Sequence, residues 1–536
     1  MFFKKISHVF LTALSFTAVA VNAFAATDYS VLAYHSVIDE SAPAKEQFYV
    51  PQTIPASTLI NQFNWLKENG YHVISWQQVI DAEQGKGELP EKAVLLTFDD
   101  GYETMYSTIF PLLKAYHYPA VFAPVTSWIS TPAGSKVDYG TKQKLDRSAF
   151  TTWNKIREMH ESGLVEIASH THDSHHGVLA NPAGSQLPAM IAPIYQNGKY
   201  ETREQYHNRI QKDLQTSVDL IAQYTGQKPR VMVWPYGQFT DATVNAAMQT
   251  GMTHHFSLDA EKINQVGDKH IGRLLLDAET DLNTIANYLN GRRDNQKVQR
   301  VIHVDLDYVY DPNPVQQKKN FDALIERVHR YGVTTVYLQA YADEDGNGVA
   351  DKLYFPNRYL PVKADLFSQV AWQLMIRTHV NVYAWLPTFA FDLRNSDQQV
   401  DYIVDNRTGK PAPNHYLRLS PYSKKNLQII RDIYNDLSFY AKFDGILFHD
   451  DAFMTDFEGK VSGENYAARG EISPEAKQKT QDLIKATLSF KQALEPYFFI
   501  RKKCGENCTQ YLCFCSKYPR GGRMVCTKFA RVYTSL

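Results

Sequence analysis

Two adjacent carboxylates end an apolar run in "LLTFDDGY", where Asp99 and Asp100 precede a glycine. Neighbouring ionised carboxylates repel each other, so an ordered pair needs a compensating positive charge. Four histidines lie close together in "EIASHTHDSHHG", at positions 170, 172, 175 and 176. Histidine nitrogens and carboxylate oxygens are common ligands of catalytic divalent metals. The two stretches together predict a metal site made of Asp100, His170 and His175.

The spacing of His170 and His175 favours a strand end and its loop over a helix. Residues five apart point about 140° apart around a helix and would not share a face. Two histidines and one carboxylate leave positions open to water, as catalytic sites require. Zinc suits this ligand set, and so do nickel, cobalt and ferrous iron. For the Asp-Asp-Gly sequence alone, a simple turn is the alternative interpretation.

Three further residues would complete a hydrolytic site. Asp99, beside the metal but not a ligand, is placed to accept a proton from water. His35, which closes the apolar run "VLAY", is the candidate proton donor; a hydrogen-bonded core histidine is the alternative. The sequence "WPYG" at 234–237 predicts a tight turn in which the backbone N–H of Tyr236 holds an oxyanion. Because a metal acidifies bound water and polarises carbonyls, the reaction class is metal-assisted hydrolysis of an acyl group.

The elements that must position these residues alternate between short apolar runs and amphipathic helical segments. The predicted strands lie at 29–37, 71–76, 93–101, 119–126, 164–171 and 230–237, and the predicted helices lie around 57–69, 104–116, 148–162, 203–224 and 240–250. This alternation is typical of an α/β layered or barrel-like domain with a mostly parallel sheet. Residues 177–202 lack periodicity, and a loop of that length is often functional, for instance as a cover over a site.

The same rhythm resumes after the polar segment 290–300. The predicted strands lie at 301–310, 334–342, 380–389 and 445–453, and the predicted helices lie at about 315–330, 364–378, 422–440 and 473–495. A (β/α) TIM-like barrel needs eight such units, so four predict an incomplete barrel with exposed sheet edges. Four aspartates lie at these strand ends, where paired carboxylates suit glycosidic cleavage or carbohydrate binding, with helix caps as the alternative: Asp305, Asp307, Asp450 and Asp451.

The two ends of the chain differ from the rest. Residues 1–25 read as a secretory signal peptide with Lys4, Lys5, an apolar stretch too short to span a bilayer, and a small-residue cleavage site. We therefore expect a periplasmic or secreted protein; no cysteine at the cleavage site offers a lipoprotein anchor. All five cysteines lie from Cys504 onward, in a basic tail at 498–536. A shifted reading frame near Phe498 is the favoured interpretation, and a disulfide-bonded tail is the alternative.

These observations divide the chain into five parts: a signal peptide at 1–25, a catalytic domain at 26–290, a linker at 291–300, a half barrel at 301–497 and an aberrant tail at 498–536. The basic tail is weak support for a nucleic-acid partner, because the preceding residues carry a net negative charge. No transmembrane helix is expected after signal cleavage.

At this point the motifs resemble a known family. TFDDG followed by HTHDSH resembles the first two motifs of the NodB-type polysaccharide deacetylases, carbohydrate esterase family four. The resemblance covers about residues 29–497 and includes "VLAYHSV", "VMVWPYG", "VIHVDLDYVYD" and "FDGILFHDD". It points to two-domain periplasmic members that act on poly-β-1,6-N-acetyl-D-glucosamine. It implies that Asp99 is the catalytic base, that Asp100, His170 and His175 bind the metal, and that a permuted motif order makes His35 the acid.

The resemblance also implies a glycoside-hydrolase-like C-terminal barrel that binds the partly deacetylated polymer, and an outer-membrane export porin as a partner. The sequence departs from the family at motif three, where Val233 replaces the usual arginine and Arg230 is poorly spaced to substitute. The late [LI]-x-H motif is not evident near "GRLLLD". The alternatives are a chitooligosaccharide or peptidoglycan deacetylase, or a carbohydrate-binding or endo-glycosidase protein with an inactive first domain. The intact Asp99 and metal triad argue against the last of these.

Overall fold

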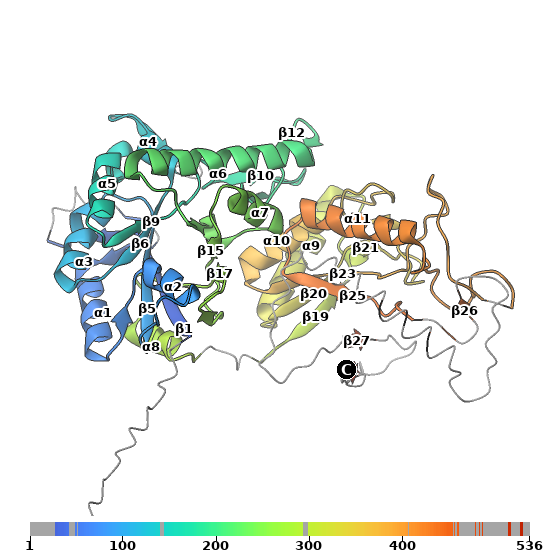
Figure 1. Ribbon diagram of the computed structural model, residues 1–536. Coiled ribbons are helices and arrows are strands. Elements are labelled where there is room, and N and C mark those ends of the chain that lie inside the picture. The colour runs from blue at the N-terminus through green and yellow to red at the C-terminus, as the bar shows by residue number, and fades with distance from the viewer. Residues whose placement is uncertain are drawn as a thin grey trace, which may run out of the picture.

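The computed structural model describes residues 27–41, 49–50, 52–139, 144–292, 298–405 and 407–453, with scattered positions beyond: 455, 458–459, 478, 482, 485, 513–515 and 526–528. Over these residues the chain forms two α/β domains, one coloured blue to green and the other yellow to orange (Figure 1). The expected signal peptide and nearly all of the expected tail and last helix lie outside the described residues. Within the described part, no helix is both long and apolar enough to cross a membrane.

The first domain is built on a curved, mainly parallel sheet. Its central strands are β1 (Asp28–Tyr34), β5 (Ala93–Asp100), β6 (Ala120–Pro124) and β9 (Val165–Ile167), with β18 (Leu274–Leu275) beside β1, β4 (His72–Val73) beside β5, and the antiparallel β16 (Asn264–Gln265) at the edge. A bridge between Ser169 and Met232 continues the sheet into a second parallel group: β14 (Val231–Val233), β15 (His254–Phe256) and β17 (His270–Ile271). The α/β barrel-like fold predicted from the sequence is confirmed.

Strand β5 is buried at every residue, which explains its unbroken apolar sequence. Leu96 and Phe98 face one core cluster, and Leu95 faces another on the opposite side of the sheet. Helices surround these clusters: α1 (Ala56–Glu68), α2 (Trp76–Glu83), α3 (Phe110–Tyr116) after the π-helical turn η2 (Met105–Ile109), α4 (Thr126–Ser130), α5 (Trp153–Glu161), α6 (Arg203–Thr225), α7 (Asp241–Gln249) and α8 (Leu282–Leu289). Five of them match predicted helices; α2, α4 and α8 were not predicted.

The second domain contains a four-stranded parallel sheet in chain order, namely β19 (Val301–Val304), β20 (Thr335–Gln339), β23 (Asn381–Leu386) and β25 (Gly445–Phe448). Helices α9 (Pro314–Arg330), α10 (Phe367–Thr378) and α11 (Lys424–Tyr440) pack on it through one apolar cluster. Over the residues that the structure describes, this is the incomplete barrel expected from four βα units.

The remaining elements are short. They are β2 (Val37–Ile38), β3 (Ile54–Pro55), β7 (Lys136–Asp138), β8 (Lys144–Asp146), η3 (Arg147–Ala149), η4 (Pro235–Gly237), η5 (Leu306–Tyr308), β21 (Tyr341–Ala342), β22 (Lys352–Leu353), β24 (Val404–Asp405), β26 (Glu458–Gly459), β27 (Cys513–Cys515) and β28 (Cys526–Lys528).

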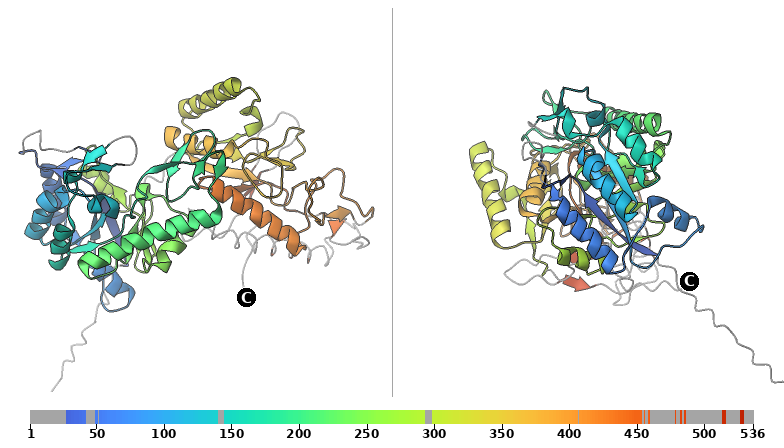
Figure 2. Two further views of the ribbon diagram at one scale, coloured as in Figure 1. Left: turned by 90° about the horizontal axis from the view of Figure 1, so that it is seen from above. Right: turned by 90° about the vertical axis from the view of Figure 1, so that its left-hand side faces the viewer.

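Residues 177–202 contact the second domain, and the expectation that they cover a site stays a prediction. They form two hairpins, β10 (Gly177–Leu179) with β11 (Gln186–Pro188), and β12 (Tyr195–Gln196) with β13 (Lys199–Tyr200). The Tyr200 hydroxyl donates to Asp365 in the second domain. Arg203, at the start of α6, donates to Asp436 at 2.8 Å and lies over the ring of Phe439. Figures 1 and 2 show α6 extending from the first domain toward α11.

Strand β15 buries His255, whose ring stacks on Trp234 at 5.7 Å between centroids. Among the described residues, neither ring nitrogen has a hydrogen-bond partner. Burial lowers the pKa of His255 to about 4, and the charges of His254 and His270 act in the same direction. The unfolded chain, with an ordinary pKa near 6.5, therefore binds more protons than the folded chain below that pH. His255 thus favours folding fully above about pH 6.5 and progressively less as the pH falls toward 4.

Replacing His255 by phenylalanine should keep the stack on Trp234 and remove this acid sensitivity. Wild-type protein is expected to lose up to about 3 kcal/mol through His255 between pH 7 and pH 4, and His255→Phe should lose correspondingly less. Urea unfolding at pH 7.5 and pH 5 measures the difference. His207→Gln, which changes an exposed histidine on α6, should follow the wild type. Equal acid sensitivity of His255→Phe and wild type would contradict the prediction.

Candidate active site

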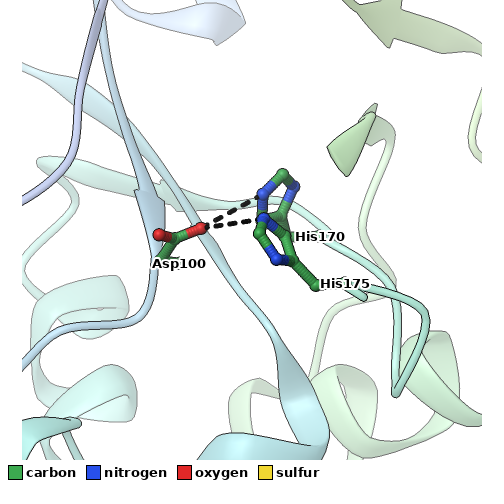
Figure 3. Close-up of side chains that lie close together, drawn as sticks. All are labelled: Asp100, His170 and His175. Atoms are coloured by element: carbon green, nitrogen blue, oxygen red, sulfur yellow. Dashed lines mark ion pairs between the residues drawn. The ribbon is translucent and has the colours of Figure 1, made fainter. Parts of the chain in front are cut away.

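The three predicted metal ligands converge at the carboxyl ends of β5 and β9. Oδ1 of Asp100 lies 3.3 Å from Nε2 of His170 and 3.4 Å from Nε2 of His175. Figure 3 shows both imidazoles directed toward the same carboxylate oxygen. The three ligand atoms lie within 4.8 Å of one another, and Asp100 and His170 are buried. The arrangement brings together residues from two strands that are separated in the sheet by β6.

The turn after β5 sets the direction of the Asp100 side chain. Asp100 has a positive φ of 75°, which is uncommon for a residue with a side chain, and Gly101 follows with φ of 104°. A Cβ on Gly101 would lie 2.9 Å from the side chain of Ile129. The Asp-Asp-Gly sequence is therefore both the turn considered as an alternative and part of the site.

The loop that carries both histidines is held by helix α6. The buried carboxylate of Asp213 accepts hydrogen bonds from the backbone N–H groups of His172 and Asp173, at 2.9 and 2.8 Å. His172 Nδ1 lies 3.0 Å from the Thr126 hydroxyl, so this histidine supports the loop rather than facing Asp100. Sequence reasoning missed Asp213; an acidic residue among the apolar positions of the 203–224 helix was the available signal.

The contacts around the three ligands fit a divalent cation. Nδ1 of His170 lies 2.7 Å from the carbonyl of Val233 and must donate to it, which leaves Nε2 facing Asp100. The other Asp100 oxygen, Oδ2, accepts from the Tyr102 hydroxyl at 2.7 Å. Oδ1 is buried, and no residue in the described ranges makes a hydrogen bond to it. Burial opposes the protonated form of His170, but Asp100 raises the pKa of His170 overall. The negative charge that attracts a proton to this position would also attract a metal cation, whose binding would displace the proton.

The protonation states agree with a ligand role. Burial lowers the pKa of His175 to about 4, so its ring is neutral near pH 7 and can bind a metal. Burial opposes the ionised form of Asp100, but its contacts with His175 and His170, whose rings carry positive charge when protonated at low pH, hold the pKa of Asp100 far below its usual range. The carboxylate is therefore ionised throughout the neutral range.

Asp99 is paired with an arginine that sequence reasoning did not identify. Both oxygens of Asp99 accept from Arg273, each at 2.9 Å, and both side chains are buried. Burial alone would raise the pKa of Asp99, but Arg273 holds it below its usual range. Arg273 also donates to the Thr97 hydroxyl and the Ser257 carbonyl.

Arg273 supplies the positive charge that the arginine of motif three would provide; this chain has Val233 at that position. Arg230, considered as a poor substitute, instead forms an ion pair with Glu166 at 3.0 Å. Arg273 lies in "GRLLLD", the segment in which the late histidine motif was sought. A single charged residue within the apolar stretch "IGRLLL" was the signal that could have identified it.

His35 and Tyr236 both lie beside this centre. His35 follows β1, whose last residue Tyr34 pairs with Phe98 of the parallel strand β5, and this places His35 at the same edge of the sheet as Asp99. Tyr236 has a positive φ of 58°, is 43% exposed, and packs its ring on His175 at 4.7 Å. Gly237 completes the tight turn, since a Cβ there would lie 2.7 Å from the backbone nitrogen of Leu258. The oxyanion role of the Tyr236 N–H stays a prediction.

The four aspartates of the second domain have different surroundings. Asp451 is fully buried and accepts from three backbone N–H groups, those of Thr388, Phe389 and Ala390. Its burial excludes direct contact with sugar in this structure, which corrects the expectation from its strand-end position. Asp307 accepts from the backbone of Asp343 and from the Tyr354 hydroxyl, so it also supports a loop.

Asp305 and Asp450 remain candidates for carbohydrate contact. Asp450 Oδ1 lies 2.8 Å from Nδ1 of His449 and accepts from the Tyr416 hydroxyl at 2.9 Å. Burial acts to raise the pKa of Asp450, but His449 and Tyr416 lower it overall. Asp305 is half-buried at the end of β19. Burial, with smaller effects from Asp343, Asp451 and Asp305, raises the pKa of the nearby Tyr341.

Comparison with known proteins assigns a family to each domain. The family described as "Polysaccharide deacetylase" matches residues 86–255, and "Hypothetical glycosyl hydrolase family 13" matches residues 303–488. The first domain thus matches the polysaccharide deacetylase family, and the second domain matches a glycosyl hydrolase family. A de-N-acetylase from Aggregatibacter actinomycetemcomitans is 59% identical over 48% of this chain and 99% of its own, with a TM-score of 0.47.

Among individual proteins, the poly-β-1,6-N-acetyl-D-glucosamine N-deacetylase of Escherichia coli K12 is 41% identical over 433 residues, or 80% of this chain. The chain spans 63% of the length of that relative. The PgaB (BpsB) glycoside hydrolase domain from Bordetella bronchiseptica is 36% identical over 38% of this chain and 62% of its own, with a TM-score of 0.33.

Proposed function

We propose that this protein is a metal-dependent N-deacetylase that removes acetyl groups from poly-β-1,6-N-acetyl-D-glucosamine. The observation that carries the proposal is the buried Oδ1 of Asp100, which faces two imidazoles beside an arginine-held Asp99. Family membership and the names of the relatives support the same reaction and the same polymer.

Asp100, His170 and His175 would hold the metal ion. A bound divalent ion would polarise the acetyl carbonyl and lower the pKa of a coordinated water. Zinc, nickel, cobalt and ferrous iron all suit two imidazoles and one carboxylate. Burial already keeps His175 neutral near pH 7, and metal binding would displace a proton from Nε2 of His170, whose other ring nitrogen donates to the Val233 carbonyl.

The other residues of the site would move protons and stabilise charge. Asp99, oriented by Arg273, accepts the proton of the water that attacks the acetyl carbon. His35 gives a proton to the departing amine, so acetate and a free glucosamine amine are the products. The backbone N–H of Tyr236 would donate to the oxygen that becomes negatively charged.

Acetate release from β-1,6-linked N-acetylglucosamine oligomers tests this proposal in the full-length chain, with and without added divalent metal. Wild-type protein should release acetate only with metal. Asp100→Ala should lose stoichiometric metal binding and nearly all activity, because Oδ1 is removed from the ligand set. Asp219→Ala, at an exposed position on α6, should retain both. Activity only on chitin or peptidoglycan fragments would show that the substrate is wrong, and no metal-dependent release from any of these would overturn the reaction.

The proposal includes export and a role for the second domain. The expected signal peptide supports a periplasmic or secreted location, and an export porin of the same system would be the partner. Asp305 and Asp450 would contact the cationic, partly deacetylated polymer. The match of residues 303–488 to a glycosyl hydrolase family supports a carbohydrate ligand for this domain.

A further inference from the structure

A chain of two tyrosine hydroxyls leads to the Asp100 carboxylate. Tyr102 is fully buried, and its hydroxyl lies 2.7 Å from Oδ2 of Asp100 and 2.5 Å from the hydroxyl of Tyr139. Its ring stacks on Phe150 with centroids 5.6 Å apart, while Trp128 contacts the rings of Tyr139, Phe150 and His175. The aromatic packing therefore fixes both hydroxyls relative to the metal ligands.

The direction of the hydrogen bonds follows from the number of protons. An ionised carboxylate only accepts, and each tyrosine hydroxyl has one proton to donate. Tyr102 uses its proton on Asp100, so its oxygen must accept the proton of Tyr139. The bonds thus run from Tyr139 to Tyr102 to Oδ2 of Asp100, and successive bonds of this kind strengthen one another.

This series of hydrogen bonds gives the two oxygens of Asp100 different environments. Oδ2 is occupied by Tyr102, whereas Oδ1 faces His170 and His175 and has no hydrogen-bond donor among the described residues. A carboxylate with both oxygens free can bind a metal through either or both of them. Because the Tyr102 hydroxyl bonds to Oδ2, it competes with binding of the metal through both oxygens.

We propose that Tyr102 and Tyr139 are positioning residues that hold Asp100 as a one-oxygen ligand and thereby set the affinity and coordination number of the bound divalent ion. The inference deepens the proposed function and rests on its metal site. Tyr139 follows strand β7, far in sequence from the ligands, so the β7–β8 segment takes part in shaping the site through Tyr102. Hydrogen bonds from residues that do not themselves bind the metal orient the ligands in metal sites generally.

Metal titrations of three variants test the inference in the full-length, metal-stripped chain. Calorimetry with Zn²⁺ should show binding about 10- to 100-fold weaker in Tyr102→Phe and a smaller loss in Tyr139→Phe. The double variant should bind no more weakly than Tyr102→Phe alone, because Tyr139 acts only through Tyr102. Tyr106→Phe is the matched control, since its hydroxyl donates to Glu158 at the surface.

A spectroscopic measurement separates positioning from simple structural support. Freeing Oδ2 should raise the coordination number of bound Co²⁺, so the visible absorption of Co²⁺-loaded Tyr102→Phe should weaken and change shape. A tyrosine that only supports the fold would lower thermal stability and leave this spectrum unchanged.

The outcomes distinguish this inference from the proposed function. A wild-type chain that binds no divalent ion would overturn the metal site and this inference together. Wild-type binding with unchanged affinity and spectrum in Tyr102→Phe would overturn the inference alone. A Tyr139→Phe loss that persists undiminished in the Tyr102→Phe background would show that the two hydroxyls act independently, which also contradicts the proposed chain.

Discussion

Asp99→Asn is expected to retain the metal and to lose turnover by about 10²- to 10⁴-fold in kcat. The amide matches the carboxylate in size, but it cannot accept a proton at neutral pH. The metal ligands are untouched, because Asp99 bonds to Arg273 and not to the side chains of His170 or His175. Substrate binding should change little, so the loss should appear in kcat rather than in KM.

Metal content and acetate release, measured on the same preparation, check this expectation. Asp100→Ala provides the contrast, because it should lose metal as well as turnover. Asp219→Ala again serves as the control at an exposed position. Retained deacetylation by a metal-loaded Asp99→Asn protein would contradict the assignment of Asp99 as the catalytic base.

The grouping of Asp100, His170 and His175 was predictable from the sequence because their pattern is local. Asp99, Asp100 and the turn glycine lie together in one short stretch, and His170 and His175 lie in another, each following a recognisable apolar run. Regular strand–helix alternation then required both strand ends to lie in the same domain. The fold class followed from the same alternation.

The partners of those residues were harder to find, because they come from distant parts of the chain. Arg273 reaches Asp99 across 174 positions, and no spacing rule connects them. Asp213 supports the histidine loop from a helix whose pattern indicates a buried acidic residue but not the backbone groups that it contacts. Both are single buried charges, and tertiary contacts offset the free-energy cost of burying them. Sequence periodicity does not encode those contacts.

In the second domain, the sequence pattern suggested functional residues that turn out to have different surroundings. Strand-end position suggested four equivalent aspartates, yet Asp451 and Asp307 satisfy backbone N–H groups of neighbouring loops. A carboxylate at a strand end can face a ligand or brace a loop, and only the local backbone decides which. For residues 177–202, the lack of periodicity predicted a long loop, whereas the structure forms two short hairpins there.

Arg273→Met is expected to destabilise the first domain by about 3–5 kcal/mol at pH 7.5, because it leaves the Asp99 carboxylate buried without its cation. Activity should fall as well, since Arg273 orients the base. Some of the loss comes from the bonds that Arg273 gives to Thr97 and Ser257. The double variant Asp99→Asn with Arg273→Met retains that loss but removes the buried charge, so it should recover much of the stability and none of the turnover.

The pH dependence of unfolding identifies the buried charge as the cause. In the wild type, Arg273 keeps the pKa of Asp99 below its usual value, so Asp99 favours folding above about pH 4 and loses that effect only as the pH falls further. Without Arg273, burial raises the pKa of Asp99, and protonation then relieves the penalty as the pH falls. The gap in unfolding free energy between wild type and Arg273→Met should therefore narrow from pH 7.5 to pH 5, in urea unfolding of the metal-free chains. A gap that stays constant, and is equal in the double variant, would show that the arginine acts through Thr97 and Ser257 rather than through Asp99.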